Sequence, residues 1–398
     1  MLLIAFGSLV LVPLLTGFDP NVTLFTAGLG TLIFQWITRG RIPVFLASSF
    51  AFIAPMIHGT AAWGISGTLC GLLAAGSVYL VLSGVVYWKG SQTLVRILPP
   101  IVTGPIIMVI GLSLAPVAVN LALGNSGDGN GRLVAESSAI AISMVSLFVT
   151  VGVSLLGKGM FKLLPVLMGT LSGFAVSIFL GVVDFGLLSE ASWFQWPAFT
   201  APTWNFEAII YILPVAIAPA IEHFGDVLAI GSVTGKDYIK NPGLHRTLLG
   251  DGLATMLAAC FGGPPNTTYS EVTGGVALTR AFNPAIMTWS AIFAIVLAFV
   301  GKMGALLRII PTPVIGGILV LLFGAITVVG MSQLVKSQED VLEPRSLAIV
   351  GIILIFGVGG MSLSAGKFTL AGVGLASVFG VFLNAILPHP TSHSSHRK

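Results

Sequence analysis

The segment PPNTTYSEVTGG, residues 264–275, decides how the rest of the chain is to be interpreted. Its Thr and Tyr residues favour extended backbone and its prolines and glycines interrupt helices, although apolar stretches flank it on both sides. It also carries a carboxyl group, Glu271. A segment of similar character, ASSFAFIAP at 47–55, lies near the N-terminus. Both segments predict interrupted helices rather than continuous ones.

Composition places these segments in a membrane protein. Only 8% of the 398 residues are charged and 55% are hydrophobic, with a mean hydropathy of +1.01. An ordinary soluble chain carries about a quarter charged residues, so a cytoplasmic enzyme, a secreted domain and a disordered chain are excluded. We therefore expect an all-α polytopic membrane protein. Its net charge of +4 reflects topology, and no nucleic-acid partner is expected.

Apolar stretches give fourteen candidate spans, since a helix needs about 20 apolar residues to cross the hydrocarbon. The candidates are 2–17, 22–38, 43–57, 66–88, 101–122, 135–156, 163–183, 208–232, 247–261, 264–279, 286–306, 312–334, 346–363 and 368–387. The third and the tenth are too short and too broken for plain helices. The chain opens at Met1 inside apolar sequence, as expected if its natural start lies upstream.

Basic residues predict the orientation of these spans. With the N-terminus inside, 14 of the 18 Lys and Arg residues fall in cytoplasmic loops, as the positive-inside rule requires. Both termini are therefore expected on the cytoplasmic side. The short polar tail at 389–398 is expected to be disordered.

An internal repeat relates the two halves. VRILPPIVTGPIIMVIG at 95–111 is similar to LRIIPTPVIGGILVLLFG at 307–324. The matched pairs are Pro100 with Pro313, Gly104 with Gly317, and Gly111 with Gly324. The predicted topology puts Arg96 inside and Arg308 outside, so the halves are inverted, with seven spans each. Inverted repeats are typical of secondary transporters. The alternative is a chance likeness between two Pro/Gly-rich helix starts.

The broken segments are the third span of each half in this scheme. We expect short strands near 48–52 and 267–271 that meet at the membrane centre, because non-helical backbone survives there only where protein or a cavity satisfies it. Each strand should continue into a half-helix whose N-terminus points at the midplane. Free N–H groups at such N-termini can bind the carbonyl oxygens of a ligand.

Most acidic residues lie in predicted loops or at span ends, and three do not: Glu222, Asp226 and Glu271. A carboxylate at the centre of a membrane helix costs about 2.5–3.5 kcal/mol. Glu222 and Asp226 are four residues apart and share a helix face. They predict a polar substrate site that exchanges protons; the structural alternative is a protonated carboxyl hydrogen-bonded within the helix bundle.

Other residues in the spans allow two interpretations. Phe50 and Tyr269 lie in the broken segments, where aromatic rings beside carboxyl groups suit a flat ring ligand, although core packing is the alternative. His223 lies outside the helix face that Glu222 and Asp226 share, so we expect it to be a packing residue. We expect Asp251 to lie near the inner membrane boundary and to pair with another residue or reach water.

The runs VLVPLLTGFDPN, SSFAFIAP, AIEHFGD, NPGLHR and GGPPNTTYSEVTGGVALTR resemble the nucleobase–ascorbate transporter family, also called xanthine/uracil permeases, over nearly the whole chain. The likeness is closest to its bacterial proton-coupled uracil permeases. It implies a multi-pass protein of the bacterial inner membrane, with strands in spans 3 and 10. A core domain would comprise 1–88 and 207–307, and a gate domain 89–206 and 308–388.

The resemblance also implies roles for single residues. Glu222 and Glu271 would contact the base, Ser270 would offer its main-chain N–H, and Phe50 its backbone and ring. Ser8 would face the base from the first span. Asp226 stands where uracil permeases have histidine and where purine-transporting relatives commonly have aspartate. The amide of the usual tenth-span motif is missing at Val272, and a Gln-His pair expected in the first helix is absent.

These observations predict a secondary active transporter that takes up a nucleobase with protons. Asp226 is the expected proton handler, with Glu222 and Glu271 as the other candidates. Uracil is favoured, with a xanthine or uric acid:proton symporter as the alternative and an inorganic-anion transporter of the same fold behind it. An enzyme is not expected, because the sequence offers no paired histidines and no intramembrane lysine, Lys302 being assigned to the outer side at the end of its span. No cofactor or metal is expected beyond the proton, and the resemblance implies a homodimer through the gate domain.

Overall fold

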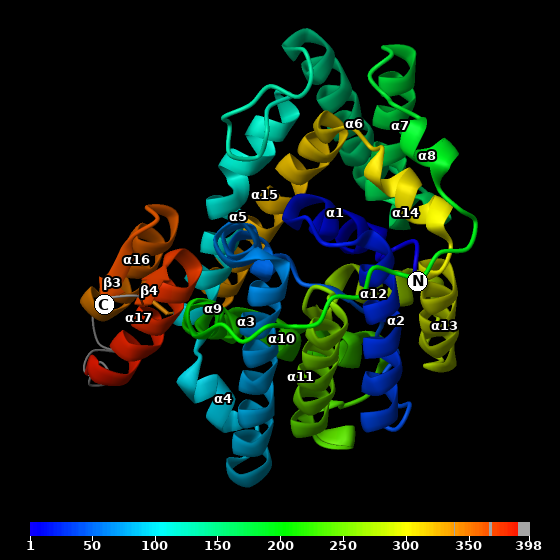
Figure 1. The fold of residues 1–398 in the computed structure, drawn as a ribbon. Helices are drawn as coiled ribbons and strands as arrows, with labels where there is room; N and C mark the ends of the chain where they lie inside the picture. Colours follow the sequence, from blue (N-terminus) through cyan, green and yellow to red (C-terminus); the bar gives the residue numbers. More distant parts are fainter. Residues whose placement is uncertain (338, 366–367, 389–398) are drawn as a thin grey trace.

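The computed structural model describes residues 1–337, 339–365 and 368–388, so the predicted disordered tail at 389–398 lies outside the described residues. Helices dominate (Figure 1), which confirms the prediction of a helical membrane protein. Five helical stretches within the described residues are long and apolar enough to cross a bilayer: Phe50–Lys89, Pro100–Ala122, Glu136–Leu156, Phe206–Thr234 and Thr312–Lys336. Shorter apolar helices accompany them, and the count of fourteen crossings stays a prediction.

The elements follow one another in two series. The first series is α1 (Phe6–Thr16), α2 (Pro20–Ile37), β1 (Leu46–Ser48), η1 (Phe50–Phe52), α3 (Ile53–Lys89), α4 (Gln92–Ile97), α5 (Pro100–Ala122), α6 (Glu136–Leu156), η2 (Gly159–Leu163), α7 (Pro165–Phe179) and α8 (Gly186–Glu190). The second series is α9 (Phe206–Ile212), η3 (Leu213–Ala216), α10 (Ile217–Thr234), η4 (Ile239–Gly243), α11 (Leu244–Phe261), β2 (Asn266–Thr268), α12 (Ser270–Thr279), α13 (Ala285–Ala298), α14 (Gly301–Arg308), α15 (Thr312–Lys336), α16 (Pro344–Val358), β3 (Ser362–Ala365), β4 (Phe368–Ala371) and α17 (Gly372–Ile386).

The two broken segments meet as a pair of short antiparallel strands. Leu46 of β1 lies opposite Thr268 of β2, and Ser48 opposite Asn266. The strands begin earlier than the expected 48–52 and 267–271, because Phe50–Phe52 forms the turn η1 that opens α3 and because α12 already begins at Ser270.

A threonine of a neighbouring helix bonds the outer edge of each strand. The N–H of Leu46 donates to Thr31 Oγ1 at 2.9 Å, and Thr255 Oγ1 donates to the carbonyl of Asn266 at 2.6 Å. These residues come from α2 and α11, which pack against each other. A buried two-stranded sheet would otherwise leave edge groups unpaired, so the hydroxyls make it stable in an apolar surrounding.

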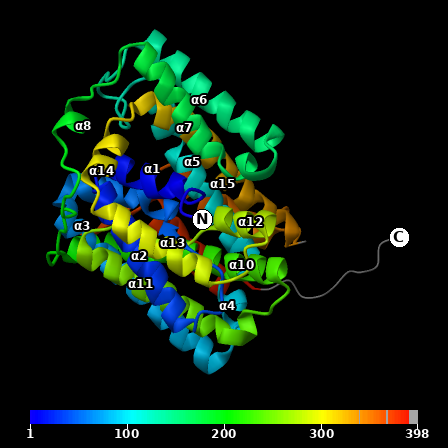
Figure 2. The same cartoon turned by 90° about the vertical axis from the view of Figure 1, so that its right-hand side faces the viewer.

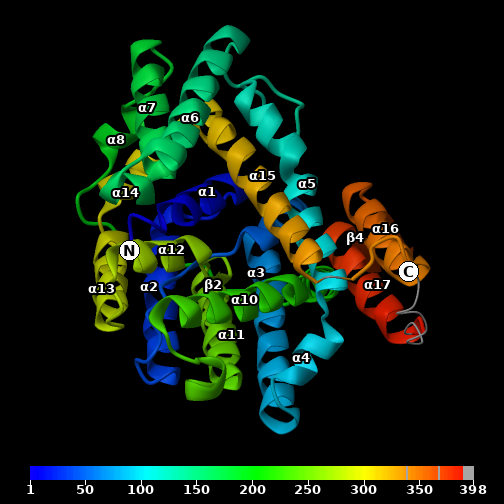
Figure 3. The same ribbon diagram turned by 180° about the vertical axis from the view of Figure 1, so that it is seen from behind.

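Helices α5 and α15 run side by side in opposite directions (Figures 1 and 3). Their backbones touch at glycines. A Cβ added at Gly104 would lie 2.8 Å from the carbonyl of Gly330, and one at Gly111 would lie 2.5 Å from the carbonyl of Phe323. Helices α6 and α7 pack together beyond them (Figure 2), while α13 packs on α2 and α11 on α3.

Several predicted spans differ from the observed helices. The stretch 208–232 is interrupted by η3 between α9 and α10, and α3 continues through the loop expected between 43–57 and 66–88. The stretch 286–306 is divided at Phe299 and Val300 into α13 and α14. The stretch 368–387 begins with β4, which pairs with β3 in an antiparallel hairpin before α17 starts at Gly372. Gly372 has φ +54°, a backbone conformation that favours glycine and ends the hairpin. Alternating small, polar and apolar residues in a stretch of high hydropathy hide this hairpin from a search for spans.

Candidate substrate cavity

A cavity of about 400 Å³ lies between two groups of elements. One wall comes from β1, η1, α10, β2 and α12, and the other from α5 and α15. The first wall contributes the carboxyl, hydroxyl and aromatic groups. The second is apolar along Ile107, Ile110, Leu322, Ala325, Ile326 and Val329, and becomes polar only at Ser332, Gln333 and Lys336. The cavity is therefore polar on one side, as sites for flat polar ligands often are.

The three predicted carboxyl groups line this one cavity. Glu222 and Asp226 reach it from α10, and Glu271 reaches it from the first turn of α12. The sequence placed Glu222 and Asp226 on one helix face, and the fold brings Glu271 to them by ending β2 beside α10. No lysine or arginine other than Lys336, at the far end of α15, belongs to the described lining.

Asp226 is held by the broken span. Its Oδ2 accepts the hydroxyl of Thr268 at 2.7 Å, and its Oδ1 accepts the hydroxyl of Ser270. Only 4% of Asp226 is exposed. Both carboxyl oxygens are thus engaged by the protein, so Asp226 ties α10 to β2 and α12 in addition to lining the cavity.

Glu222 differs from Asp226 in this respect. The residue is half-buried, and its side chain makes no hydrogen bond to any described residue. Glu271 is exposed to the cavity space at the N-terminal end of α12. Because no described residue donates to its oxygens, Glu222 is free to accept a hydrogen bond from a ligand N–H.

Two helix N-termini point to the same place. Ser49 precedes η1 and the half-helix that opens α3, and Tyr269 precedes α12. The first turn of a helix has N–H groups without intrahelical acceptors, together with the positive end of the helix dipole. Phe50 at the first start and Tyr269 and Ser270 at the second all line the cavity. Ligand carbonyl oxygens would find donors here.

The two predicted aromatic residues both line the cavity. The ring centroids of Phe50 and Tyr269 are 6.2 Å apart, with the planes tilted by 47°. Ser8, which was expected to face the ligand, is fully buried and absent from the described lining. The hydroxyl of Tyr269 lies against Gly7 and Ser8 of α1, so Tyr269 stands between Ser8 and the cavity.

A second polar cluster lies behind the strands, and the sequence analysis did not identify its members as partners. Asp251 is fully buried and is paired, as one of its two expected alternatives had it: its Oδ2 lies 3.3 Å from His223 Nδ1 and accepts the hydroxyl of Thr267 at 3.3 Å. His223 Nδ1 is also 3.4 Å from Thr268 Oγ1. His223 therefore packs, as expected, against Phe34, but it also bonds a carboxyl group.

Comparisons with known proteins agree with this architecture. The sequence profile of the xanthine/uracil permeases, described as the Permease family, matches residues 1–366. A probable uracil permease of Haemophilus influenzae is 51% identical over 388 residues, which cover 98% of this chain and 92% of the relative. The uracil permease of Bacillus caldolyticus is 42% identical over 392 residues, covering 96% and 89%.

A solved structure shares the fold at much lower sequence identity. The transmembrane domain of the cyanobacterial bicarbonate transporter BicA superposes with a TM-score of 0.63 over 96% of this chain and 94% of that chain. The two sequences are 14% identical. At this identity the similarity shows the arrangement of helices and strands. It does not indicate what the polar residues of the cavity bind.

Proposed function

The chain belongs to the permease family of xanthine/uracil transporters, and from this premise we propose that it carries a nucleobase, with uracil favoured, across the bacterial inner membrane together with protons. The observation that carries the proposal is the cavity that Glu222, Asp226 and Glu271 line together with the residues at the starts of η1 and α12, beside the strand pair. Relatives over nearly the whole chain are named uracil permeases, which supports the choice of base.

Recognition follows from the two kinds of group in the cavity. A pyrimidine base offers ring N–H donors and carbonyl acceptors on its edge. Glu222, which lacks a protein partner among the described residues, accepts a ring N–H. The N–H groups at the starts of η1 and α12 donate to the carbonyl oxygens, and the rings of Phe50 and Tyr269, which contact each other, pack beside the base.

Proton coupling uses the carboxyl cluster. Three carboxyl groups around one small cavity cannot all be ionised without strong mutual repulsion. A proton bound to one of them lowers this repulsion in the carrier that holds the base. We assign the proton to the pair of Glu222 and Asp226, with Glu271 as the next candidate. Both oxygens of Asp226 already accept hydroxyl groups, so a proton held there has to be shared with Thr268 or Ser270.

Transport requires the two walls of the cavity to move past each other. We propose that 1–88 and 207–307 form a core that carries the base and that 89–206 and 308–388 form a gate. The division of the lining supports this, since β1, α10 and α12 fall in the core and α5 and α15 in the gate. Alternating access is commonly a rocking of one such unit against the other.

We also propose fourteen spans in two inverted halves, with cytoplasmic termini. The antiparallel contact of α5 with α15 and the matching edge bonds of Thr31 and Thr255 support this symmetry. The salt bridge between Asp19 and Arg308, at 2.8 Å, joins two residues that the topology places outside. A homodimer through the gate remains part of the proposal.

The test is uptake by the purified chain in proteoliposomes. Labelled uracil should accumulate when an inward proton gradient is imposed, and an uncoupler should abolish the accumulation. Accumulation of labelled xanthine or uric acid but not of labelled uracil would transfer the proposal to a purine symporter. Uptake of bicarbonate or sulfate without any base uptake would overturn it in favour of an anion carrier.

A further inference from the structure

Helix α15 brings a single carboxamide to the substrate cavity. Gln333 lines it together with Ser332 and Lys336, where the otherwise apolar wall becomes polar. The opposite wall supplies carboxyl and hydroxyl groups, which mostly accept hydrogen bonds from a ligand. A side-chain donor on the α15 side would therefore add to the main-chain N–H donors that the carboxyl-bearing wall offers at the starts of η1 and α12.

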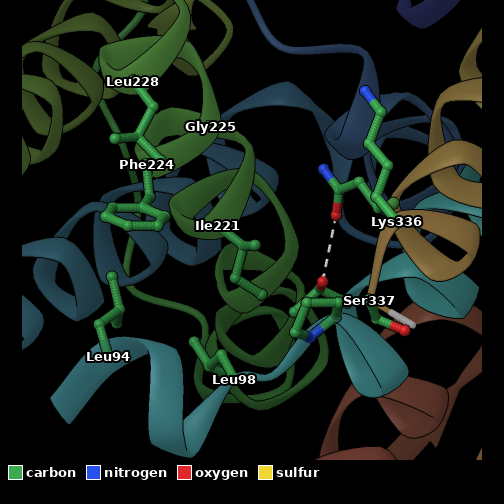
Figure 4. Close-up of a pocket in the computed structure, with 11 residues that line it drawn as sticks. Leu94, Leu98, Ile221, Phe224, Gly225, Leu228, Lys336 and Ser337 are labelled. Atoms are coloured by element: carbon green, nitrogen blue, oxygen red, sulfur yellow. Dashed lines mark hydrogen bonds between the residues drawn. The ribbon is translucent and has the colours of Figure 1, made fainter. Parts of the chain in front are cut away.

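Gln333 also borders a second, smaller cavity of about 240 Å³ (Figure 4). There Ile221, Phe224 and Leu228 of α10 face Leu94 and Leu98 at α4, and Lys336 and Ser337 lie on the opposite side. The two cavities share Gly225, Gln333 and Lys336. The side chain of Gln333 thus stands at the boundary between them, half-buried.

The orientation of the amide is fixed by α5. Thr103, which is 2% exposed, donates its hydroxyl to Gln333 Oε1 at 3.1 Å, the bond drawn as a dashed line in Figure 4. Gln333 Nε2 has no hydrogen-bond partner among the described residues. With the oxygen occupied, the amide offers two N–H donors and no free acceptor site of equal quality.

The close crossing of α5 and α15 makes this bond possible. Gly104 follows Thr103 directly, and Gly330 lies three residues before Gln333. A Cβ at either glycine would come within 2.8 Å of the other's carbonyl oxygen. Backbones so close bring the short threonine side chain within reach of the glutamine, which side chains at the crossing would prevent.

The space in front of the amide is open. Gly225 lies three residues after Glu222 on α10 and borders both cavities with Gln333. A Cβ at Gly225 would meet nothing within 4 Å. A flat ring that bonds Glu222 can therefore extend past Gly225 toward α15 without a side chain in its path.

We infer that Gln333 is a specificity-determining residue that donates a hydrogen bond to a ring carbonyl oxygen of the substrate, with Thr103 as the positioning residue that holds its amide. This inference rests on the proposed function. The contact comes from the wall opposite the carboxyl groups, so it forms only when the two walls close around the base. A substrate with a poorer hydrogen-bond acceptor in place of this ring carbonyl oxygen should therefore bind more weakly.

The experiment measures binding of uracil, 2-thiouracil and 4-thiouracil to the full-length purified protein. Sulfur accepts hydrogen bonds weakly, so the wild type should bind one of the two analogues about tenfold more weakly than uracil. Gln333→Leu should weaken uracil binding to about the level of that analogue. The ratio of the two dissociation constants, that of the analogue to that of uracil, should then be close to one. Thr103→Val should shift the ratio in the same direction, and Thr103→Ser should leave it unchanged.

The outcomes separate the inference from the proposed function. A wild type that binds no base overturns the proposed function and the inference with it. A wild type that binds uracil, but whose preference over both thio analogues survives in Gln333→Leu and Thr103→Val, overturns the inference alone. A merely structural role of the pair would lower the thermal stability, or weaken all three ligands by one factor, and leave the ratios intact.

Discussion

The hydroxyl of Thr268 on β2 donates to Asp226 Oδ2 on α10 at 2.7 Å, which fastens the broken span to the helix that carries two of the cavity carboxyl groups. Thr268 is 1% exposed and Asp226 is 4% exposed, so water does not replace this bond. The position of Ser270 and Glu271 at the start of α12 depends on it, because both follow Thr268 within three residues. The strand pair and the substrate site are therefore one mechanical unit.

Replacing Thr268 tests this unit. Thr268→Val keeps the shape and removes the hydroxyl, which leaves a buried carboxyl oxygen with one donor fewer and costs about 1–3 kcal/mol. The thermal unfolding temperature of the detergent-solubilised protein should fall, and base binding should weaken with it. Thr268→Ser keeps the donor and should unfold close to the wild type. Equal behaviour of the two variants would contradict the role of the bond.

Glu222→Gln tests base recognition. The substitution puts an amide where the ring N–H expects an acceptor, and the resulting mismatch costs about 1–3 kcal/mol. Binding of uracil should fall at least about tenfold in isothermal titration. Glu136→Gln, which changes a loop-side glutamate paired with Arg132, is the matched control and should bind normally. Unchanged affinity of Glu222→Gln would remove Glu222 from the site.

Asp226→Asn tests proton coupling. The side-chain oxygen can still accept one hydroxyl and the amide can donate to the other, so the cavity should keep its shape. Accumulation of base driven by a proton gradient should be lost, while counterflow between equal base pools persists at least in part. Both are measured in liposomes. If this variant still accumulates base against the concentration gradient of the base, the proton is bound elsewhere. Glu271 would then be the next residue to change.

Gly225→Leu tests the open path between α10 and α15. A Cβ at Gly225 meets nothing within 4 Å, so the new side chain should enter the cavity without straining the fold. Base binding should be abolished while the unfolding temperature stays the same or rises, since leucine favours helix over glycine. Gly84→Leu is the control, because its Cβ also meets nothing within 4 Å and Gly84 borders neither cavity. A Gly225→Leu variant that binds uracil normally would show that the base lies elsewhere.

Gly111→Ala and Gly324→Ala test the contact of α5 with α15. A Cβ at Gly111 would lie 2.3 Å from Thr327 Oγ1 and 2.5 Å from the carbonyl of Phe323, whereas one at Gly324 meets nothing within 4 Å. The first variant should therefore unfold at a lower temperature and the second at the wild-type temperature or above. Equal shifts would indicate that α5 and α15 cross differently.

The sequence by itself determined the class of the protein and the places where its helices break. Low charge and high hydropathy leave a membrane as the one surrounding in which the chain can fold, because burial in hydrocarbon depends on composition. The residues of the segments at 47–55 and 264–275 predict extended backbone, because they have a local preference for it. Glu222, Asp226 and Glu271 were predicted as site residues because an intramembrane carboxyl group is costly wherever the helices lie.

Only the tertiary structure decided which of these groups are free and which are already bonded. Asp226 and Glu222 share a helix face, yet Thr268 and Ser270 satisfy the first and leave the second for a ligand. Asp251 and His223 looked unremarkable because each finds its partner on another helix. Gly111 and Gly324 match in the repeat, but only Gly111 lies where two backbones touch. Propensity and burial cost act along the chain, whereas the partner of a polar atom depends on how distant helices cross.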